Sequence, residues 1–246
     1  MTSPADSPPD IESVAALKAR IAALEGEIDQ FAYIVSHDLQ APVRTLQSFG
    51  HLLRSEFGEQ LGEDGQQYLD FISNAGSQIT TLLKGLLLYS RARRIEDLDD
   101  RVSLDEAWQQ ACAKFNEEQR AALQVVDGPL GHARGNRDAL IALLQHLLDN
   151  AVQNAHPERP LQVRIRAQST DGWRLLELRD NGVGIPVDLL GAACEVFRRV
   201  HAENTGRAGM GLAICREIVQ RHGGELRLES PAEGGLSLQI RLPEGA

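Results

Sequence analysis

Two stretches of the chain carry apolar residues at alternating spacings of three and four, and this pattern constrains the fold more than any other feature. Such spacing keeps one apolar seam of a helix facing a partner helix. The first seam consists of Val14, Leu17, Ile21, Leu24, Ile28, Phe31 and Val35. The second, after a turn rich in glycine, consists of Tyr68, Ile72, Ala75, Ile79, Leu82, Leu86 and Tyr89. The pattern predicts two long antiparallel helices.

A hairpin of two helices buries too little apolar surface to be stable alone, so we expect it to pair with a second copy as a four-helix bundle. The prediction is a homodimer; the alternative is that both helices belong to the core of a monomer. Residues 1–10, rich in Pro, Ser and Asp, are expected to form a disordered tail. Residues 11–95 are assigned to the coiled coil and the hairpin.

The remaining segment, residues 96–246, begins in a charged linker and then alternates between helical and strand patterns. Helices are predicted over residues 104–120, 136–154 and 209–222. Strands are predicted over residues 123–126, 161–167, 173–179, 225–229 and 236–242. This order predicts a second domain of the α+β class, in which helices cover one face of a mixed sheet.

The composition excludes several classes of protein. A net charge of −10 argues against binding to nucleic acid. The sequence contains no apolar run of 18 residues, so it predicts no membrane span. The three cysteines, Cys112, Cys194 and Cys215, have no metal-ligand spacing and are expected to be reduced thiols. With no signal peptide at the N-terminus, the chain is expected to be soluble and cytoplasmic.

Four short motifs carry residues suited to phosphoryl chemistry. His37 and Asp38 lie in Ser-His-Asp-Leu-Gln-Ala-Pro and could form a nucleophile with its acid/base partner. Asn150 lies in Leu-Asp-Asn-Ala, on a predicted helix. The turn at residues 180–184 reads Asp-Asn-Gly-Val-Gly, and the helix start at residues 209–212 reads Gly-Met-Gly-Leu, where backbone amides suit phosphate oxygens. Each motif alone is also typical of solvated helix residues, a helix cap or an ordinary turn.

Together and in this order, the motifs resemble the H, N, G1 and G2 boxes of the sensor histidine kinases of two-component signalling, over about residues 31–243. Phe-Arg-Arg-Val-His at residues 197–201 and Gly-Leu-Ala-Ile-Cys at residues 211–215 resemble the phytochrome-type branch. The resemblance implies a dimeric phosphoacceptor hairpin followed by an α/β sandwich of the GHKL type, the fold shared with gyrase-like ATPases. Light sensing does not follow, since the chain shows no chromophore-binding domain.

The resemblance also implies roles for individual residues, with ATP and Mg²⁺ as cofactors. His37 would be phosphorylated with Asp38 as its acid/base partner, Asn150 would ligate Mg²⁺, and Asp180 would accept the exocyclic amine of adenine. The remaining residues expected to contact the nucleotide are Gln153, Gly182, Gly184, Arg199, Gly209 and Gly211. No Gly-Lys-Ser/Thr follows the glycines, so the motif is not a P-loop.

Several positions depart from the family pattern. His146 replaces the first Asn of the N box, and Gln153 stands where a Lys or Arg commonly meets phosphate. Cys194 replaces a Phe, and Arg207 replaces the first glycine of the G2 box. Ala41, four residues after the histidine, lacks the polar group that orients a hydrolytic water. We therefore expect weakened ATP use and little phosphatase activity.

The leading hypothesis is a homodimeric ATP- and Mg²⁺-dependent histidine kinase that passes its phosphoryl group to an aspartate on the receiver domain of a response regulator. Because no sensor domain precedes the coiled coil, we expect a separate sensor or regulatory protein to act through residues 1–35. The rival hypothesis is a non-catalytic phosphotransfer or scaffold protein with a degenerate nucleotide site. An ATPase of the gyrase or chaperone kind is disfavoured, because such proteins have no His-Asp hairpin upstream.

Overall fold

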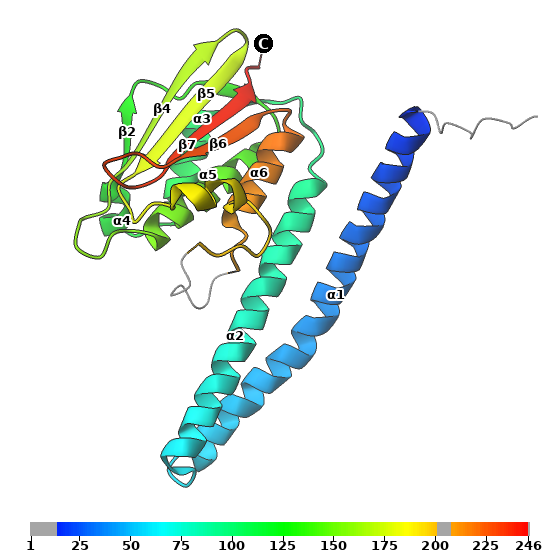
Figure 1. The fold of residues 1–246 in the computed structure, drawn as a ribbon, viewed down its shortest axis with the longest axis vertical. Coiled ribbons are helices and arrows are strands. Elements are labelled where there is room, and N and C mark those ends of the chain that lie inside the picture. Colours follow the sequence, from blue (N-terminus) through cyan, green and yellow to red (C-terminus); the bar gives the residue numbers. More distant parts are fainter. Residues whose placement is uncertain (1–13, 201–207, 246) are drawn as a thin grey trace, which may run out of the picture.

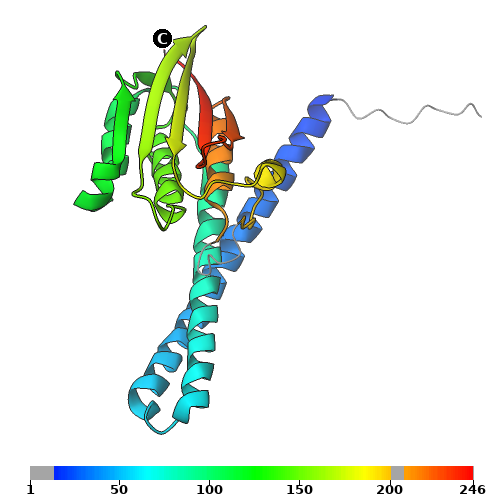
Figure 2. The ribbon, with the colours of Figure 1, turned by 60° about the vertical axis from the view of Figure 1, so that its left-hand side comes forward.

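The computed structural model describes residues 14–200 and 208–245, and it begins with the predicted helical hairpin (Figure 1). Helix α1, Val14–Phe57, continues through Pro42, and α2, Gly62–Arg93, returns beside it. The two helices are in contact near the turn and diverge toward the N-terminal end of α1 (Figure 2). The expected tail at residues 1–10 and the departure at Arg207 lie outside the described residues.

Most of each apolar seam is exposed in the single chain. Exposed seam residues on both helices are Leu17, Ile21, Leu24, Ile28, Tyr68, Ile72 and Ile79. Of the hairpin side chains that the structure describes, few apolar ones are buried, among them Val43, Leu69 and Leu83. The exposed residues of both seams therefore do not belong to a core of the single chain, whereas Tyr89, at the end of the second seam, packs against the main buried core.

The second domain contains a five-stranded sheet in the order β2-β4-β5-β7-β6. The strands are β2 Leu123–Asp127, β4 Val163–Thr170, β5 Trp173–Asp180, β6 Glu225–Glu229 and β7 Ser237–Pro243. Strands β2 and β4 are parallel and the other neighbours are antiparallel, so the sheet is mixed, as predicted. All five predicted strands are confirmed, to within two or three residues at their ends.

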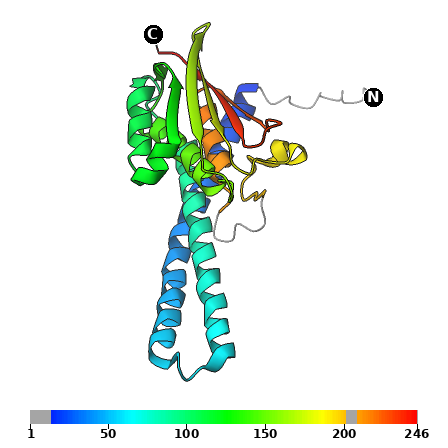
Figure 3. The same ribbon diagram turned by 90° about the vertical axis from the view of Figure 1, so that its left-hand side faces the viewer.

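Three helices pack behind this sheet in Figure 1, and Figure 3 shows the same layers from the side. They are α3 Leu104–Cys112, α5 Arg137–Gln153 and α6 Gly211–Arg221. Helix α5 buries an inner stripe consisting of Leu140, Leu143, Leu144, Leu147, Leu148 and Ala151. These residues occupy positions i, i+3, i+4, i+7, i+8 and i+11, so they share one helix face and meet the apolar side chains of the sheet. At about 1.5–3 kcal/mol per buried leucine, this stripe holds α5 in a fixed position.

Residues 104–120 do not form the single helix that the sequence predicted. Helix α3 ends at Cys112, and a separate helix α4, Glu117–Ala122, begins after Asn116. The reason is a capping box: the Asn116 side chain accepts from the Gln119 N–H, and the Gln119 side chain accepts from the Asn116 N–H. A two-stranded sheet of β1 Arg101–Ser103 and β3 His132–Arg134 was not predicted either.

Candidate functional site

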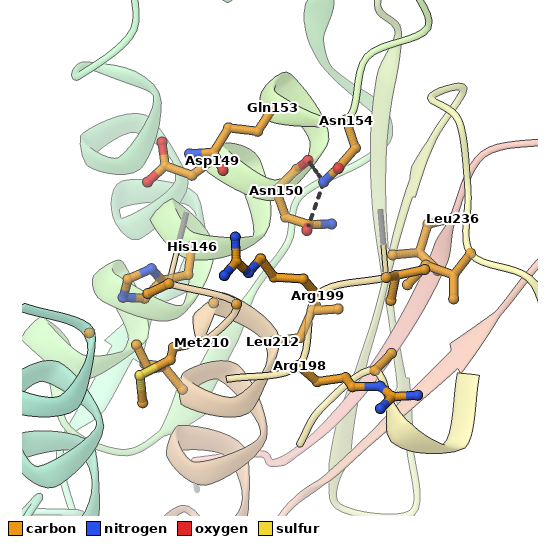
Figure 4. Close-up of a pocket in the computed structure, with 18 of the residues that line it drawn as sticks. His146, Asp149, Asn150, Gln153, Asn154, Arg198, Arg199, Met210, Leu212 and Leu236 are labelled. Atoms are coloured by element: carbon orange, nitrogen blue, oxygen red, sulfur yellow. Dashed lines mark hydrogen bonds between the residues drawn. The ribbon is translucent and has the colours of Figure 1, made fainter. Parts of the chain in front are cut away.

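A cavity of about 380 Å³ lies where α2, α5, the start of α6 and the segment after the 3-10 helix η1, Val187–Ala192, come together (Figure 4). Seven residues predicted to contact nucleotide line it: Asn150, Gln153, Asp180, Gly184, Arg199, Gly209 and Gly211. Motifs up to 60 residues apart in the sequence thus meet in one place. Gly182 does not line the cavity but is hydrogen-bonded to Asp180, which does.

Asp180 lies at the end of β5 and is only 5% exposed. One carboxylate oxygen, Oδ1, accepts hydrogen bonds from the backbone N–H of Gly182 at 2.8 Å and of Leu236 at 3.2 Å. Burial raises the pKa of this carboxyl, and the two backbone hydrogen bonds oppose the rise. A side chain held in this way presents its second oxygen in a fixed direction.

Gly182 joins this turn to the end of α5. A Cβ atom at this position would lie 2.3 Å from the carbonyl oxygen of Asn154, so only glycine permits the approach. The same carbonyl accepts from the N–H of Val183 at 2.9 Å. The turn that carries Asp180 is therefore anchored to the helix that carries Asn150.

The Asn150 side chain is oriented by Asn154, one turn further along. The Asn154 Nδ2 donates to the Asn150 Oδ1 at 3.0 Å and to the Asn150 carbonyl at 2.7 Å (Figure 4). An amide oxygen has two lone pairs, so Oδ1 can still bind a cation. One fixed amide oxygen fits Mg²⁺ carried by a nucleotide, since this ion takes most of its ligands from phosphates and water.

Cationic side chains come from the segment after η1. Arg198 and Arg199 both line the cavity, and Figure 4 shows the Arg199 side chain directed between His146 and Asn150. Burial lowers the pKa of His146, so at neutral pH this ring is uncharged. The guanidinium groups, together with the backbone at the start of α6, make this part of the cavity suited to an anion.

His37 and Asp38 lie on the exposed surface of α1, with side chains more than 70% exposed. The His37 Nδ1 is 3.2 Å from the Asp38 Oδ1, and the Tyr33 ring stacks near the imidazole with centroids 6.5 Å apart. Among the residues that the structure describes, none from α1 lines the cavity. The structure therefore does not bring these two residues together with the other predicted site residues.

One wall of the cavity was not predicted from the sequence. It comes from α2, through Thr81, Lys84, Gly85 and Leu88. These residues lie beside the apolar seam of α2, and no motif marked them, because docking of one domain on another leaves no periodic pattern.

Cys194, which stands at the Phe position of the family pattern, does not line the cavity. The residue is buried, and burial raises the pKa of its thiol.

Both parts of the chain match described protein families. Residues 27–95 match "His Kinase A (phospho-acceptor) domain", and residues 135–246 match "Histidine kinase-, DNA gyrase B-, and HSP90-like ATPase". These are the two domains of the sensor histidine kinases, and the chain belongs to this family.

Full-length relatives support this assignment. Cyanobacterial phytochrome A of Nostoc sp. is 29% identical over 89% of this chain, which spans 29% of that protein. The swarming motility regulation sensor protein RssA of Serratia marcescens is 30% identical over 96% of this chain, which spans 51% of it. The chain thus covers between 29% and 51% of the length of these two relatives.

Solved structures agree on the fold. The structure of full-length ShkA in complex with AMPPNP is similar to this one with a TM-score of 0.62 and 20% sequence identity. The match covers 88% of this chain and 46% of the ShkA chain. The mycobacterial sensor histidine kinase MprB has a TM-score of 0.51 at 27% identity, over 58% of this chain and 97% of that one. The hairpin followed by a GHKL-type domain is therefore a known arrangement. Of the helices that the structure describes, none has the length and apolar character that crossing a membrane requires.

Proposed function

We propose that the chain is a homodimeric histidine kinase that transfers the γ-phosphate of Mg-ATP to His37 and then to an aspartate of a response regulator. The observation that carries this proposal is the cavity that joins Asp180, Asn150 and Arg199, together with an exposed His37–Asp38 pair on the hairpin. The cavity has the groups needed to bind a nucleotide, and the pair has those needed to accept a phosphoryl group.

Each end of the nucleotide has a matching group in the cavity. The two backbone hydrogen bonds fall on the Asp180 Oδ1, so Oδ2 is the oxygen that accepts the exocyclic amine of adenine. Asn150 would hold Mg²⁺, which neutralises charge on the phosphates when bound. Arg198 and Arg199 would provide positive charge in a cavity where Gln153 is neutral.

The chemistry at His37 follows from its contact with Asp38. A carboxylate only accepts hydrogen bonds, so the proton lies on Nδ1 and the lone pair of Nε2 is available. As Nε2 forms its bond to the γ-phosphorus, the bond from phosphorus to the β,γ-bridging oxygen breaks and its electron pair leaves with ADP. Asp38 stabilises the resulting imidazolium and takes the Nδ1 proton.

A second copy of the chain is the proposed partner of the exposed seams. The exposed apolar residues of α1 and α2 form a long stripe of the kind that a four-helix bundle buries. In this proposal residues 11–95 form the dimerisation and phosphoacceptor hairpin, and residues 96–246 form the ATP-binding domain. A receiver domain would dock beside His37, and a separate sensor or regulatory protein would act through residues 1–35.

The second candidate function is a phosphotransfer or scaffold protein that no longer uses ATP. The observation in its favour is that α5 presents Gln153 and an uncharged His146 to the cavity instead of a cation. In this case the hairpin would still dock a receiver domain, but phosphate would reach His37 from another phosphoprotein.

Incubation of the purified chain with γ-labelled ATP and Mg²⁺ separates the two functions. The kinase proposal predicts acid-labile, base-stable label on the wild type and none on His37→Gln or Asn150→Ala. Mixed dimers of the two variants test whether the label also crosses between protomers. A folded dimer that binds no Mg-ATP in calorimetry and acquires no label would refute the kinase and favour the scaffold.

A further inference from the structure

The phosphoacceptor hairpin supplies one wall of the nucleotide cavity. Its lining residues on α2 are Thr81, Lys84, Gly85 and Leu88, which follow one another at spacings of three, one and three. Residues at positions i, i+3, i+4 and i+7 lie on one face of a helix, so a single stripe of α2 faces the cavity. One face of α2 thus contributes about two helical turns to the wall of the cavity.

Gly85 explains how α2 comes so close. It is buried, and a Cβ atom there would lie 2.9 Å from the Met210 Sδ and 3.0 Å from the Ala208 Cβ. Figure 4 shows Met210 beside α2, next to the N-terminal end of α6. Glycine in a helix interior is unfavourable compared with alanine. At this position it lets the helix pack directly against the start of α6.

Lys84, an exposed residue, precedes this contact by one position and lines the same cavity. Of the described residues that line the cavity, the lysine and arginine residues are Lys84, Arg198 and Arg199. The two arginines come from the segment after η1, whereas Lys84 reaches the cavity from the opposite domain. Among the described residues, the wall formed by α5 contributes the neutral amide of Gln153 and no lysine or arginine.

We propose that Lys84 is a phosphate-binding residue of the nucleotide site, so that the hairpin itself supplies the cation that α5 lacks. The inference rests on the proposed function, because it requires that the cavity binds ATP. An ammonium group with three donors suits the oxygens of a triphosphate. Nucleotide binding and docking of α2 on the ATP-binding domain are then coupled, since Lys84 reaches the phosphates only while the two are in contact.

Calorimetric binding of Mg-ATP and of adenosine to the full chain tests this role. Lys84→Gln keeps the length and polarity of the side chain and removes the charge. We expect it to weaken Mg-ATP about three- to tenfold, as for a partly solvated ion contact, and to leave adenosine binding unchanged. Lys84→Arg should retain most of the affinity. Arg164→Gln, on the exposed face of β4, removes the same charge away from the cavity and serves as the matched control.

A double-mutant cycle with Gly85→Leu separates a direct contact from a general effect of charge. A leucine would overlap with the Met210 side chain and the Ala208 Cβ and should release α2, which removes Lys84 from the cavity. In this background Lys84→Gln should cause no further loss of Mg-ATP affinity.

Three results would overturn the inference while leaving the kinase proposal intact. They are equal binding of Mg-ATP by wild type and Lys84→Gln, an equal loss for adenosine, and a full additional loss in the Gly85→Leu background. If the wild-type chain itself bound no Mg-ATP, the proposed function would fail, and this inference would fail with it.

Discussion

Replacing Asp180 by Asn should change which base the cavity prefers. The backbone N–H groups of Gly182 and Leu236 converge on one oxygen of the Asp180 side chain, at 2.8 and 3.2 Å. An asparagine in this place must put its own oxygen there, because an amide NH₂ group cannot accept. Its NH₂ group then takes the position of the Asp180 Oδ2 and faces the base as a donor.

The magnitude follows from this exchange. The adenine amine loses an ionised acceptor, and such a hydrogen bond contributes about 1.5–3 kcal/mol, so Mg-ATP should bind about ten- to 150-fold more weakly. Mg-ITP carries a carbonyl in place of the amine and can accept from the new NH₂ group. The variant should therefore favour ITP over ATP relative to the wild type. The two backbone hydrogen bonds remain, so the free energy of unfolding should change by less than about 1 kcal/mol.

Competition calorimetry with Mg-ATP and Mg-ITP at pH 7.5 measures the preference, and urea denaturation verifies the fold. The raised pKa of Asp180 supplies a second readout. Protonation of the carboxyl removes the acceptor, so acidification should weaken ATP binding by the wild type more than by Asp180→Asn. An unchanged ratio of ATP to ITP affinity in a folded variant would refute the assignment of Oδ2 to the base.

Three further perturbations have defined outcomes. Burial lowers the pKa of His222, whose Nε2 accepts a hydrogen bond from the Asn136 N–H. Below pH 6.5 the unfolded chain therefore binds the proton more tightly than the folded chain. The free energy of unfolding should then fall as the pH falls, by at most about 1.4 kcal/mol per pH unit. This slope should be smaller in His222→Gln, as measured by urea denaturation from pH 7.5 to 5.5. Leu147→Ala, at a fully buried position of α5, should lower the same free energy by about 2–5 kcal/mol at neutral pH. Ala41→Thr should raise the rate at which the chain dephosphorylates its response regulator, whereas a wild-type chain that already does so rapidly would refute the predicted lack of phosphatase activity.

The sequence was most informative where one periodic pattern decides the structure. The three-four seams predicted both helices of the hairpin, and alternating apolar residues predicted β4 to within three residues of its observed ends. The resemblance of the motifs to those of the histidine kinases predicted that Asn150, Asp180 and Gly209 would lie together, and all three line the cavity. These features depend on local patterns that the folded chain preserves.

What the sequence did not predict depends on contacts between segments. The break between α3 and α4 has a local signal, the capping box of Asn116 with Gln119 three residues later. The prediction missed it because the helical pattern continues on both sides of Asn116. The approach of α2 to the cavity has no local signal. In the sequence, Gly85 indicates only a residue that is unfavourable in a helix. The structure shows that its lack of a Cβ atom lets α2 pack against Met210.

The docking of α2 has a kinetic consequence that separates binding from transfer. No described residue of α1 lines the cavity, so transfer to His37 of the same chain would require the contact between α2 and the cavity to open first. If Lys84 strengthens ATP binding in the docked arrangement, ATP stabilises that arrangement by the same factor, because coupling is reciprocal. At saturating Mg-ATP, Lys84→Gln should therefore label His37 at least as fast as the wild type, while needing about three- to tenfold more ATP for half the maximal rate. Rapid-quench labelling across a range of ATP concentrations, with Arg164→Gln as control, measures both quantities. A lower maximal rate in Lys84→Gln would instead place Lys84 in the transfer step itself and refute the argument that docking opposes it.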